Sequence, residues 1–155
     1  MSDAFGRIAA LNARYARCID DGALADWPGF FAARCLYRVT TAANHRDGLD
    51  AGIIYADSRA MLVDRVAALA EANIYERHAY RHILGAPFVL DEDSDGARSE
   101  TAFLVLRIMR DGTTDVFASG RYVDDVRFDA TGAVFAQRIV VCDSTRIDTL
   151  LALPL

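Results

Sequence analysis

The aspartates, histidines and tyrosines of this chain could carry out acid–base catalysis. A carboxylate that faces a histidine inside an apolar pocket has a shifted pKa, and the two groups can then move a proton on a bound substrate. A structural interpretation stands beside it, because Asp20 ends an expected helix, His45 lies in a polar loop and Asp143 precedes a Ser-Thr pair that it could cap. Both interpretations stay open for the candidate side chains, which are Tyr15, Asp20, Tyr37, His45, His82 and Asp143.

A metal site is the second possibility, and the spacing of the histidines argues against it. His78 and His82 are four residues apart, which on a helix would place both side chains on one face. Their apolar neighbours favour a strand instead, in which residues four apart lie about 13 Å from each other. The cysteines supply no pair suited to a zinc site or a Rieske cluster, because they are widely spaced at Cys18, Cys35 and Cys142. Nucleophile elbows and phosphate-binding glycine loops are also absent from the sequence.

The segment YERHAYRHILG, residues 75–85, combines arginine, tyrosine and histidine in a short span. Arginine and tyrosine are enriched at the centres of protein interfaces, so one interpretation is a contact surface. The other, of equal weight, is a solvated edge strand whose long side chains lie flat. Arginines on strands among apolar neighbours also need carboxylate partners, within the chain or across an interface. The interface candidates are Tyr75, Arg77, Tyr80, Arg81, His82, Arg107 and Arg138.

Periodic patterns place these side chains on helices in the first half of the chain and on strands in the second. Helices are expected over residues 4–20 and 57–72, the second capped by Asp57 or Ser58, with a short irregular helix up to about Ala33. Strands are expected at Cys35–Thr41, 79–90, 100–110, 113–127 and 133–142, with a polar loop after the first. Turns are predicted at Asp95-Gly96, Asp111-Gly112 and Thr131-Gly132, and Asp-Gly favours the type I′ hairpin, whose central residues have positive φ.

Helices followed by a strand meander form an α+β pattern. Long antiparallel strands and N-terminal helices suggest a curved, mainly antiparallel sheet wrapped round a hydrophobic cone, the NTF2-like (cystatin-like) architecture. The run TAFLVLRIM, residues 101–109, predicts a central strand covered on both faces, and Gly120 predicts a bulge or bend. We expect residues 1–155 to form one such domain, with the apolar ending LLALPL packed on its own sheet or on a neighbouring subunit.

Charge and composition limit the partners. The net charge is −5 and the 17 basic residues, all arginine, are scattered, so nucleic acid is not expected. Polar and charged residues interrupt the N-terminal apolar segment, so neither a signal peptide nor a membrane span is expected. An odd number of widely spaced cysteines favours a reducing compartment, and we expect the protein to be cytoplasmic.

Four segments together resemble the small (β) subunit of the aromatic-ring-hydroxylating dioxygenases. They are WPGFFAARCLYRVTTAANHRDGL, DSRAMLVDRVAAL with YERHAYRHILG, TAFLVLRIMRDG with VFASGRYVD, and the ending VCDSTRIDTLLALPL. The resemblance covers nearly the whole chain, and its specificity comes from the number and order of the motifs. Among family members it is strongest to those that act on terephthalate or a similar aromatic acid.

The resemblance implies a non-catalytic, structural subunit with no cofactor of its own. The large (α) subunit of such an oxygenase carries the Rieske [2Fe-2S] cluster and the mononuclear Fe(II), usually in an α3β3 hexamer. A separate reductase component passes electrons from NADH or NADPH. No catalytic or metal-binding residue of the family can be carried over to this chain. The alternative is a stand-alone NTF2-like isomerase or dehydratase with an Asp–His pair in the cone, or a ligand-binding module of the same fold.

Overall fold

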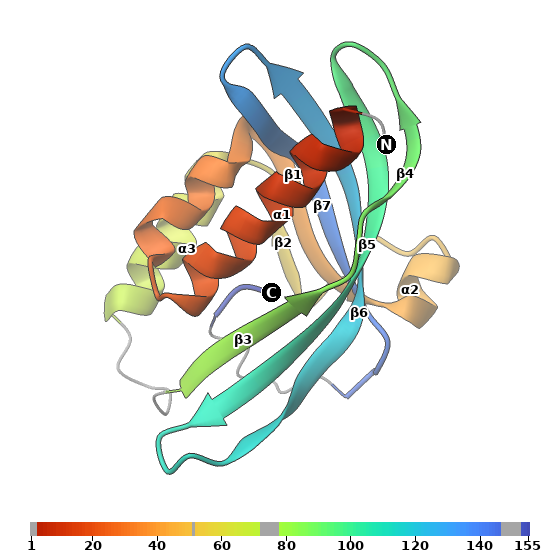
Figure 1. The fold of residues 1–155 in the computed structure, drawn as a ribbon. Coiled ribbons are helices and arrows are strands. Elements are labelled where there is room, and N and C mark those ends of the chain that lie inside the picture. The colour runs from red at the N-terminus through yellow and green to blue at the C-terminus, as the bar shows by residue number, and fades with distance from the viewer. Residues whose placement is uncertain (1–2, 51, 72–77, 147–152) are drawn as a thin grey trace.

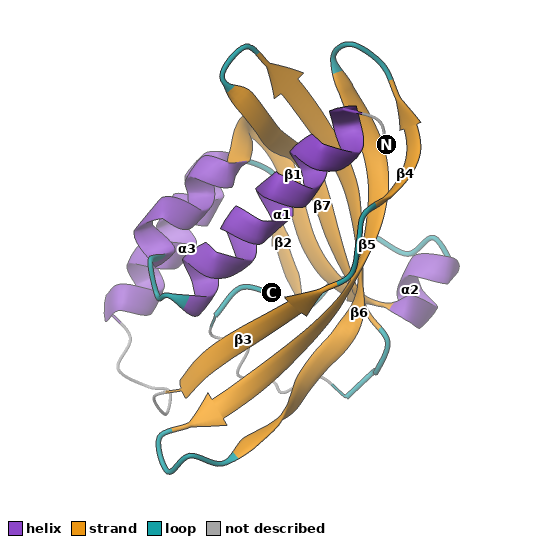
Figure 2. Cartoon of the chain, in the orientation of Figure 1, coloured by secondary structure: helices purple, strands orange, loops and turns teal. Residues whose placement is uncertain are grey.

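The computed structural model describes residues 3–50, 52–71, 78–146 and 153–155. Helices α1 and α3 lie on the concave side of a curved sheet, and the short α2 lies on its opposite side (Figures 1 and 2). The helical elements are α1 (Asp3–Asp20), the 3-10 helix η1 (Leu24–Phe30), α2 (Ala42–Arg46) and α3 (Arg59–Glu71). The strands are β1 (Phe31–Thr41), β2 (Ile54–Ala56), β3 (His78–Leu84), β4 (Phe88–Glu92), β5 (Gly96–Met109), β6 (Thr114–Asp129) and β7 (Gly132–Cys142).

The described strands form one seven-stranded sheet in the order β2-β1-β7-β6-β5-β3, with β4 also paired to β5. Every pairing is antiparallel except that of β1 with β7, which is parallel. Register shifts interrupt the β5–β6 and β6–β7 ladders, and such irregularities bend strands. The predicted α+β arrangement of helices on a curved, mainly antiparallel sheet is therefore confirmed.

Helix α1 buries the stripe that its sequence predicts. Ile8, Leu11 and Tyr15 are fully or almost fully buried, and Cys18 lies at the edge of the same stripe. The helix ends where Gly22 adopts a φ of 76°, a conformation that costs glycine little. Its last carbonyl groups are then satisfied by the N–H groups of residues 22 and 23. Local periodicity and one glycine therefore account for this helix.

The hairpins occur where turn residues predict them, but the expected type I′ geometry is wrong. Among the described residues no residue other than glycine has a positive φ, whereas type I′ turns need two consecutive ones. Aspartate side chains hold the turns instead. Asp111 accepts a hydrogen bond from the N–H of Thr113 at 2.8 Å, and Asp129 accepts one from the N–H of Thr131 at 2.8 Å. The aspartate therefore acts through its side chain rather than through its backbone.

Three other expectations need correction. The predicted strand 79–90 is divided into β3 and β4 by Gly85–Pro87, and both parts pair with β5. Strand β1 begins at Phe31 rather than Cys35, and the predicted polar loop after it contains α2, capped by the Thr41 hydroxyl, and precedes the unpredicted β2. Gly120 is no bulge: a Cβ atom there would lie 1.9 Å from the carbonyl oxygen of Val141, so this glycine permits close strand contact.

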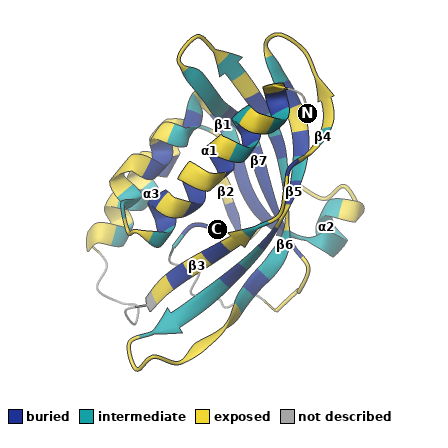
Figure 3. Ribbon diagram, viewed as in Figure 1, coloured by how far each residue is buried: buried dark blue, intermediate teal, exposed yellow. Residues whose placement is uncertain are grey.

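Burial of the central strand β5 differs between its two faces (Figure 3). Thr101, Phe103 and Val105 point into the core and are buried. Leu104 and Leu106, on the opposite face, are half-exposed. The prediction of a central strand is confirmed, whereas cover on both faces is not found within the described part of the chain.

Candidate functional site

The described part of the cone encloses a buried charged pair. Arg138 of β7 is fully buried and donates two hydrogen bonds to Asp124 of β6, from Nε at 2.9 Å and from Nη2 at 2.8 Å. The same Nη2 donates to the side-chain oxygen of Asn12, which in turn donates to the Thr101 hydroxyl at 3.2 Å. This network joins α1 to the three strands β5, β6 and β7. It is the arrangement expected of a structural ion pair, because a buried charge must be paired and hydrogen-bonded.

Aromatic rings surround the guanidinium. The Cζ atom of Arg138 lies 3.8 Å from the ring centre of Tyr122, 3.9 Å from that of Phe135 and 4.4 Å from that of Tyr15. Burial alone would lower the pKa of Arg138, but the Asp124 carboxylate raises it above its ordinary value, so the cation persists. Burial raises the pKa of Asp124 even though Arg138 opposes that change. The interior is therefore occupied by protein groups that hold one another.

The end of the chain lies on the concave side of the sheet, between the helices and the strands (Figure 1). Leu155 is fully buried, and its main-chain oxygen accepts hydrogen bonds from the hydroxyl groups of Tyr15 at 2.6 Å and Tyr37 at 3.1 Å. The N–H of Leu155 donates to the Tyr37 hydroxyl at 3.2 Å. Packing of the ending on its own chain is thus confirmed for residues 153–155, and residues 147–152 lie outside the described part.

Asp20 and His82 are the candidate acid–base residues that the fold brings together. Asp20 at the end of α1 lies 2.7 Å from His82 Nδ1 and accepts the backbone N–H of His82 at 2.9 Å. Both side chains are almost fully buried, and His82 Nε2 has no hydrogen-bond partner among the described residues. Two hydrogen bonds that the Asp20 carboxylate accepts from His82 hold the end of α1 against the edge strand β3. An open hollow of about 560 Å³ lies beside this contact, lined by Ala13, Ala16, Arg17, Asp20, Asp21, Arg81, His82 and Leu84.

The other acid–base candidates lie apart from this pair. His45 is on α2, on the far side of the sheet, where burial and the charges of Arg121 and Arg38 lower its pKa. Asp143 accepts a hydrogen bond from the Ser119 hydroxyl at 3.0 Å and joins the end of β7 to β6. Tyr15 and Tyr37 bind Leu155, as described above. His78 belongs to β3, as the strand prediction requires.

The predicted interface residues are divided between the core and the surface. Tyr80, His82 and Arg138 are buried inside the cone. Arg81 has an exposed side chain, 66% accessible and 3.9 Å from Asp20, and Arg107 pairs with Asp115 at 3.2 Å. Tyr75 and Arg77 lie outside the described residues. Arg81 and Arg107 are therefore the described candidates whose side chains reach the surface.

An apolar strip on the outer face of the sheet was missed by the sequence analysis. Ile83 pairs with Leu104, and Leu106 lies between Arg81 and Val116 in adjacent strands. Ile83 and Val116 are exposed, while Leu104 and Leu106 are half-exposed. The signal was present in the apolar run of residues 102–106, which was interpreted as part of a strand covered on both faces. We call Ile83, Leu104, Leu106 and Val116 the outer strip.

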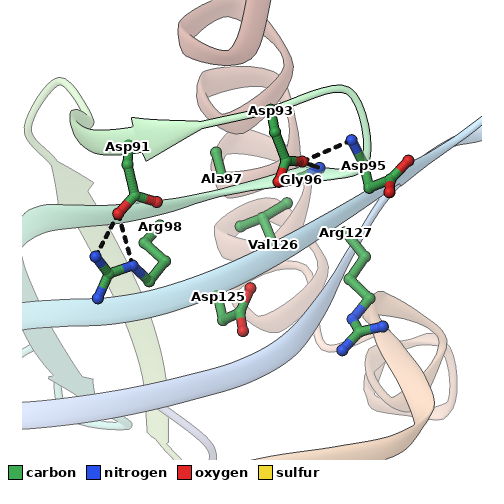
Figure 4. A pocket seen from close by; sticks show the side chains of 9 residues that line it. All are labelled: Asp91, Asp93, Asp95, Gly96, Ala97, Arg98, Asp125, Val126 and Arg127. Atoms are coloured by element: carbon green, nitrogen blue, oxygen red, sulfur yellow. Dashed lines mark hydrogen bonds and ion pairs between the residues drawn. The ribbon is translucent and has the colours of Figure 1, made fainter.

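A second surface hollow, of about 250 Å³, is lined largely by charged residues at the β4–β5 turn and β6 (Figure 4). Its carboxylates have local structural partners. Asp93 accepts the N–H groups of Asp95 at 2.8 Å and Gly96 at 3.0 Å, and Asp91 pairs with Arg98. The cluster therefore stabilises the turn.

The described side chains do not cluster as metal ligands do. In residues 3–50, 52–71, 78–146 and 153–155, no three His, Cys, Asp or Glu side chains are grouped so that they could hold an ion. The three cysteines are unpaired and buried. The described residues therefore offer no ligand set for a Rieske cluster or a mononuclear iron. Among the described helices, none is long and apolar enough to cross a membrane.

Comparisons with known proteins agree with the fold. Residues 14–149 match the family model described as ring hydroxylating beta subunit. One relative is subunit beta 1 of the terminal oxygenase component of terephthalate 1,2-dioxygenase from Comamonas sp.. It is 54% identical to this chain over 96% of this chain and 97% of its own length. The anthranilate 1,2-dioxygenase small subunit of Burkholderia cepacia is 32% identical over 96% of this chain and 92% of its own.

Solved structures support the same assignment. A protein of Novosphingobium aromaticivorans, described as the β subunit of an aromatic-ring-hydroxylating dioxygenase, superposes with a TM-score of 0.90. It is 36% identical, with 98% of this chain and 97% of its own covered. The β subunit of benzoate 1,2-dioxygenase from Burkholderia mallei, 18% identical, shares the fold with a TM-score of 0.76 over 92% of this chain and 93% of its own. The expected NTF2-like architecture is confirmed, and the chain belongs to the family of ring-hydroxylating dioxygenase β subunits.

Proposed function

We propose that this chain is the structural small subunit of an oxygenase that dihydroxylates terephthalate or a closely similar aromatic acid. The observation that carries the proposal is 54% identity, over nearly the whole chain, to two terephthalate 1,2-dioxygenase β subunits. In this proposal the large subunit holds the Rieske cluster, the mononuclear Fe(II) and the aromatic substrate. Three large and three small subunits form the complex, and a reductase supplies electrons from NADH or NADPH. The unpaired cysteines suit the reducing cytoplasm, where we place the complex.

The filled cone supports a packing role. Its interior is occupied by the Arg138–Asp124 pair, aromatic rings and Leu155. A catalytic pocket needs a concave space in which substrate atoms approach the reacting groups. Among the described residues, protein groups fill the centre of the cone, and the hollow beside Asp20 and His82 lies at its open edge.

We place the contact with the large subunit on the outer strip. Apolar residues at the centre with arginine beside them are the usual composition of an interface. Arg81 lies beside Leu106 in the sheet and has an exposed guanidinium. Burying each apolar side chain of the strip would contribute roughly 1.5–3 kcal/mol.

Co-expression with the large subunit tests this surface. Ile83→Asp should weaken the mixed complex by about 30- to 1,000-fold, as expected for loss of a central contact worth about 2–4 kcal/mol. Tyr55→Asp is the matched control, because Ile83 (51% exposed) and Tyr55 (53% exposed) lie on the two opposite edge strands β3 and β2. Equal yields of complex with both variants, measured by affinity capture and size-exclusion chromatography, would contradict the placement. Failure of the unaltered chain to form any mixed complex would contradict the proposed function itself.

The Asp20–His82 pair supports a second candidate function, that of a stand-alone isomerase or dehydratase, because its geometry is that of a general base. A neutral His82 donating from Nδ1 to Asp20 would have Nε2 as a proton acceptor. Its burial argues for a structural role, which predicts that Asp20→Asn lowers the stability of the chain but leaves turnover per assembled oxygenase unchanged. A stand-alone isomerase or dehydratase would instead lose activity in the isolated chain without unfolding. Assays of cyclic ketone substrates with the isolated chain distinguish the two.

A further inference from the structure

Leu155 lies on the concave side of the sheet between the helices and the strands, a place that we call the mouth of the cone, and side-chain hydrogen bonds hold it there as they would hold a ligand. Two fully buried tyrosines contribute all three of its described hydrogen bonds: Tyr15 donates at 2.6 Å, and Tyr37 donates at 3.1 Å and accepts at 3.2 Å. The tyrosines come from α1 and β1, which are far from Leu155 in the sequence. Leu155 itself belongs to no helix and pairs with no strand of the sheet. Side chains therefore recognise this residue, whereas backbone pairing joins the strands of the sheet to one another.

The surroundings of Leu155 form a prebuilt site. Tyr15 and Tyr37 belong to an aromatic cluster in which Phe31 lies 6.3 Å from Tyr15 and 5.7 Å from Tyr37, measured between ring centres. Trp27 lies 5.2 Å from Tyr37 in the same way. Edge-to-face ring contacts of this kind hold each phenol in place independently of what its hydroxyl binds. The two hydroxyls therefore converge on one point inside an apolar enclosure.

We propose that the mouth of the cone is a binding site for an acylated, branched aliphatic amino acid, which this chain fills with its own Leu155. The ligand needs an isobutyl group for the apolar enclosure, a carbonyl oxygen for Tyr15 and Tyr37, and an amide N–H for Tyr37. N-acetyl-L-leucine carries all three groups, with a carboxylate oxygen as the acceptor. Removing the tail should therefore create a site that this molecule refills from solution. The inference does not depend on the large subunit or on any catalytic role of the chain.

The experiment compares the full chain with a chain shortened to end at residue 152. Loss of a buried leucine from a domain of this size should lower the melting temperature by about 5–15 °C. N-acetyl-L-leucine at ten times its dissociation constant should raise the melting temperature of the shortened chain by about 3–6 °C. The full chain should show no such rise, because its site is occupied. The D enantiomer is the matched control for non-specific stabilisation.

Two further variants identify the site and guard against a shortened chain that does not fold. Tyr37→Phe in the shortened chain removes both of the Tyr37 hydrogen bonds and should weaken the ligand at least tenfold. Leu155→Ala keeps the backbone and empties only the side-chain space, which should then bind xenon and shift the NMR signals of Tyr15 and Tyr37. The full chain should show neither shift.

Several outcomes would overturn the proposal. Equal stabilisation by the L and D enantiomers, or stabilisation that Tyr37→Phe leaves unchanged, would show that the tyrosines do not recognise the ligand. If the shortened chain does not fold, the absence of xenon binding in Leu155→Ala would show that the side chain occupies no enclosed site. Failure of the chain to bind a large subunit would leave these results unaffected, so the two proposals are tested separately.

Discussion

Replacing Arg138 by methionine should remove the cation at the centre of the cone and keep most of the apolar volume. Arg138 donates two hydrogen bonds to Asp124 and one to Asn12, and three aromatic rings lie within 4.4 Å of its Cζ atom. Methionine fills irregular apolar space well, so the cavity left behind is small. The main consequence is electrostatic, because the carboxyl group of Asp124 keeps its burial and loses its partner.

The expected cost follows from that unpaired carboxylate. Breaking a buried ion pair by removing one partner destabilises a protein by about 3–5 kcal/mol, whereas a single ring contact of a cation contributes about 0.5–2 kcal/mol. For a domain of this length each kcal/mol corresponds to roughly 2–4 °C in melting temperature. Arg138→Met should therefore lower the melting temperature by about 6–20 °C, measured by calorimetry or circular dichroism.

The pH dependence of this loss identifies its cause. Burial already raises the pKa of Asp124, and Arg138 opposes the rise, so removing Arg138 raises that pKa further. The folded variant then binds a proton that the unfolded chain releases near pH 4, and its stability falls as pH rises from about 4 towards the raised pKa. The slope is at most about 1.4 kcal/mol per pH unit. The variant should consequently be closest to the parent protein in stability under mildly acidic conditions.

The double substitution Arg138→Met with Asp124→Leu is the control. Replacing a whole buried pair by apolar residues is often neutral or stabilising, so the double variant should recover most of the lost stability. A double variant no more stable than Arg138→Met would refute the electrostatic explanation and favour one based on packing. A loss below about 1 kcal/mol in the single variant, independent of pH, would refute it as well.

Three further measurements test the interior and the strand contacts. Burial raises the pKa of Tyr15, Tyr37 and Tyr122, so the folded chain keeps their protons and loses stability as pH rises above about 10. A spectroscopic titration should show these three tyrosines ionising only when the chain unfolds. Ionisation of all the tyrosines in the folded chain, as for fully accessible side chains, would contradict this. Gly120→Ala should destabilise the protein by an amount near the upper end of about 1–3 kcal/mol, because the new Cβ would lie 1.9 Å from the carbonyl oxygen of Val141. Gly6→Ala in α1, where a Cβ would meet nothing within 4 Å, should stabilise the protein by about 0.5–1 kcal/mol. Equal denaturation midpoints for the two variants would contradict this contrast. Burial raises the pKa of Cys142 to about 12, so at neutral pH its thiolate fraction should be on the order of a thousandfold lower than that of a free cysteine. Cys142 should therefore react with a disulfide reagent only after the chain unfolds. Rapid reaction of Cys142 in the native chain would contradict this.

Local signals were sufficient for helices α1 and α3 and for the positions of the predicted hairpins. The three- and four-residue spacing of Ile8, Leu11 and Tyr15 places them on one face of α1 wherever that helix packs. The Asp-Gly and Thr-Gly pairs mark reversals because their turn chemistry is contained within a few residues. Even there, the φ values depended on which aspartate oxygen met which N–H, so the turn type was predicted wrongly.

Local signals could not assign the faces of the strands. Asp124 and Asp125 are adjacent, and Asp124 points into the cone, paired with Arg138. Ile139 and Val140 lie on opposite faces of β7, yet both are buried, so alternation in hydrophobicity carries no information there. Register shifts in the β5–β6 and β6–β7 ladders change the faces again. The sequence therefore predicted that Arg138 needs a carboxylate partner, but it did not predict which carboxylate that is.

The sequence by itself determined the fold class, the order of most elements, the absence of metal-ligand motifs and, through resemblance along nearly its whole length, the family. These properties depend on residue type and short-range spacing, which a linear chain displays directly. The tertiary structure alone decided that Arg138 lies in the core and Arg81 on the surface, that Asp20 meets His82, and that Leu155 occupies the mouth of the cone. Those contacts join residues 62 to 140 positions apart, and their formation depends on how strands register and how the sheet curves.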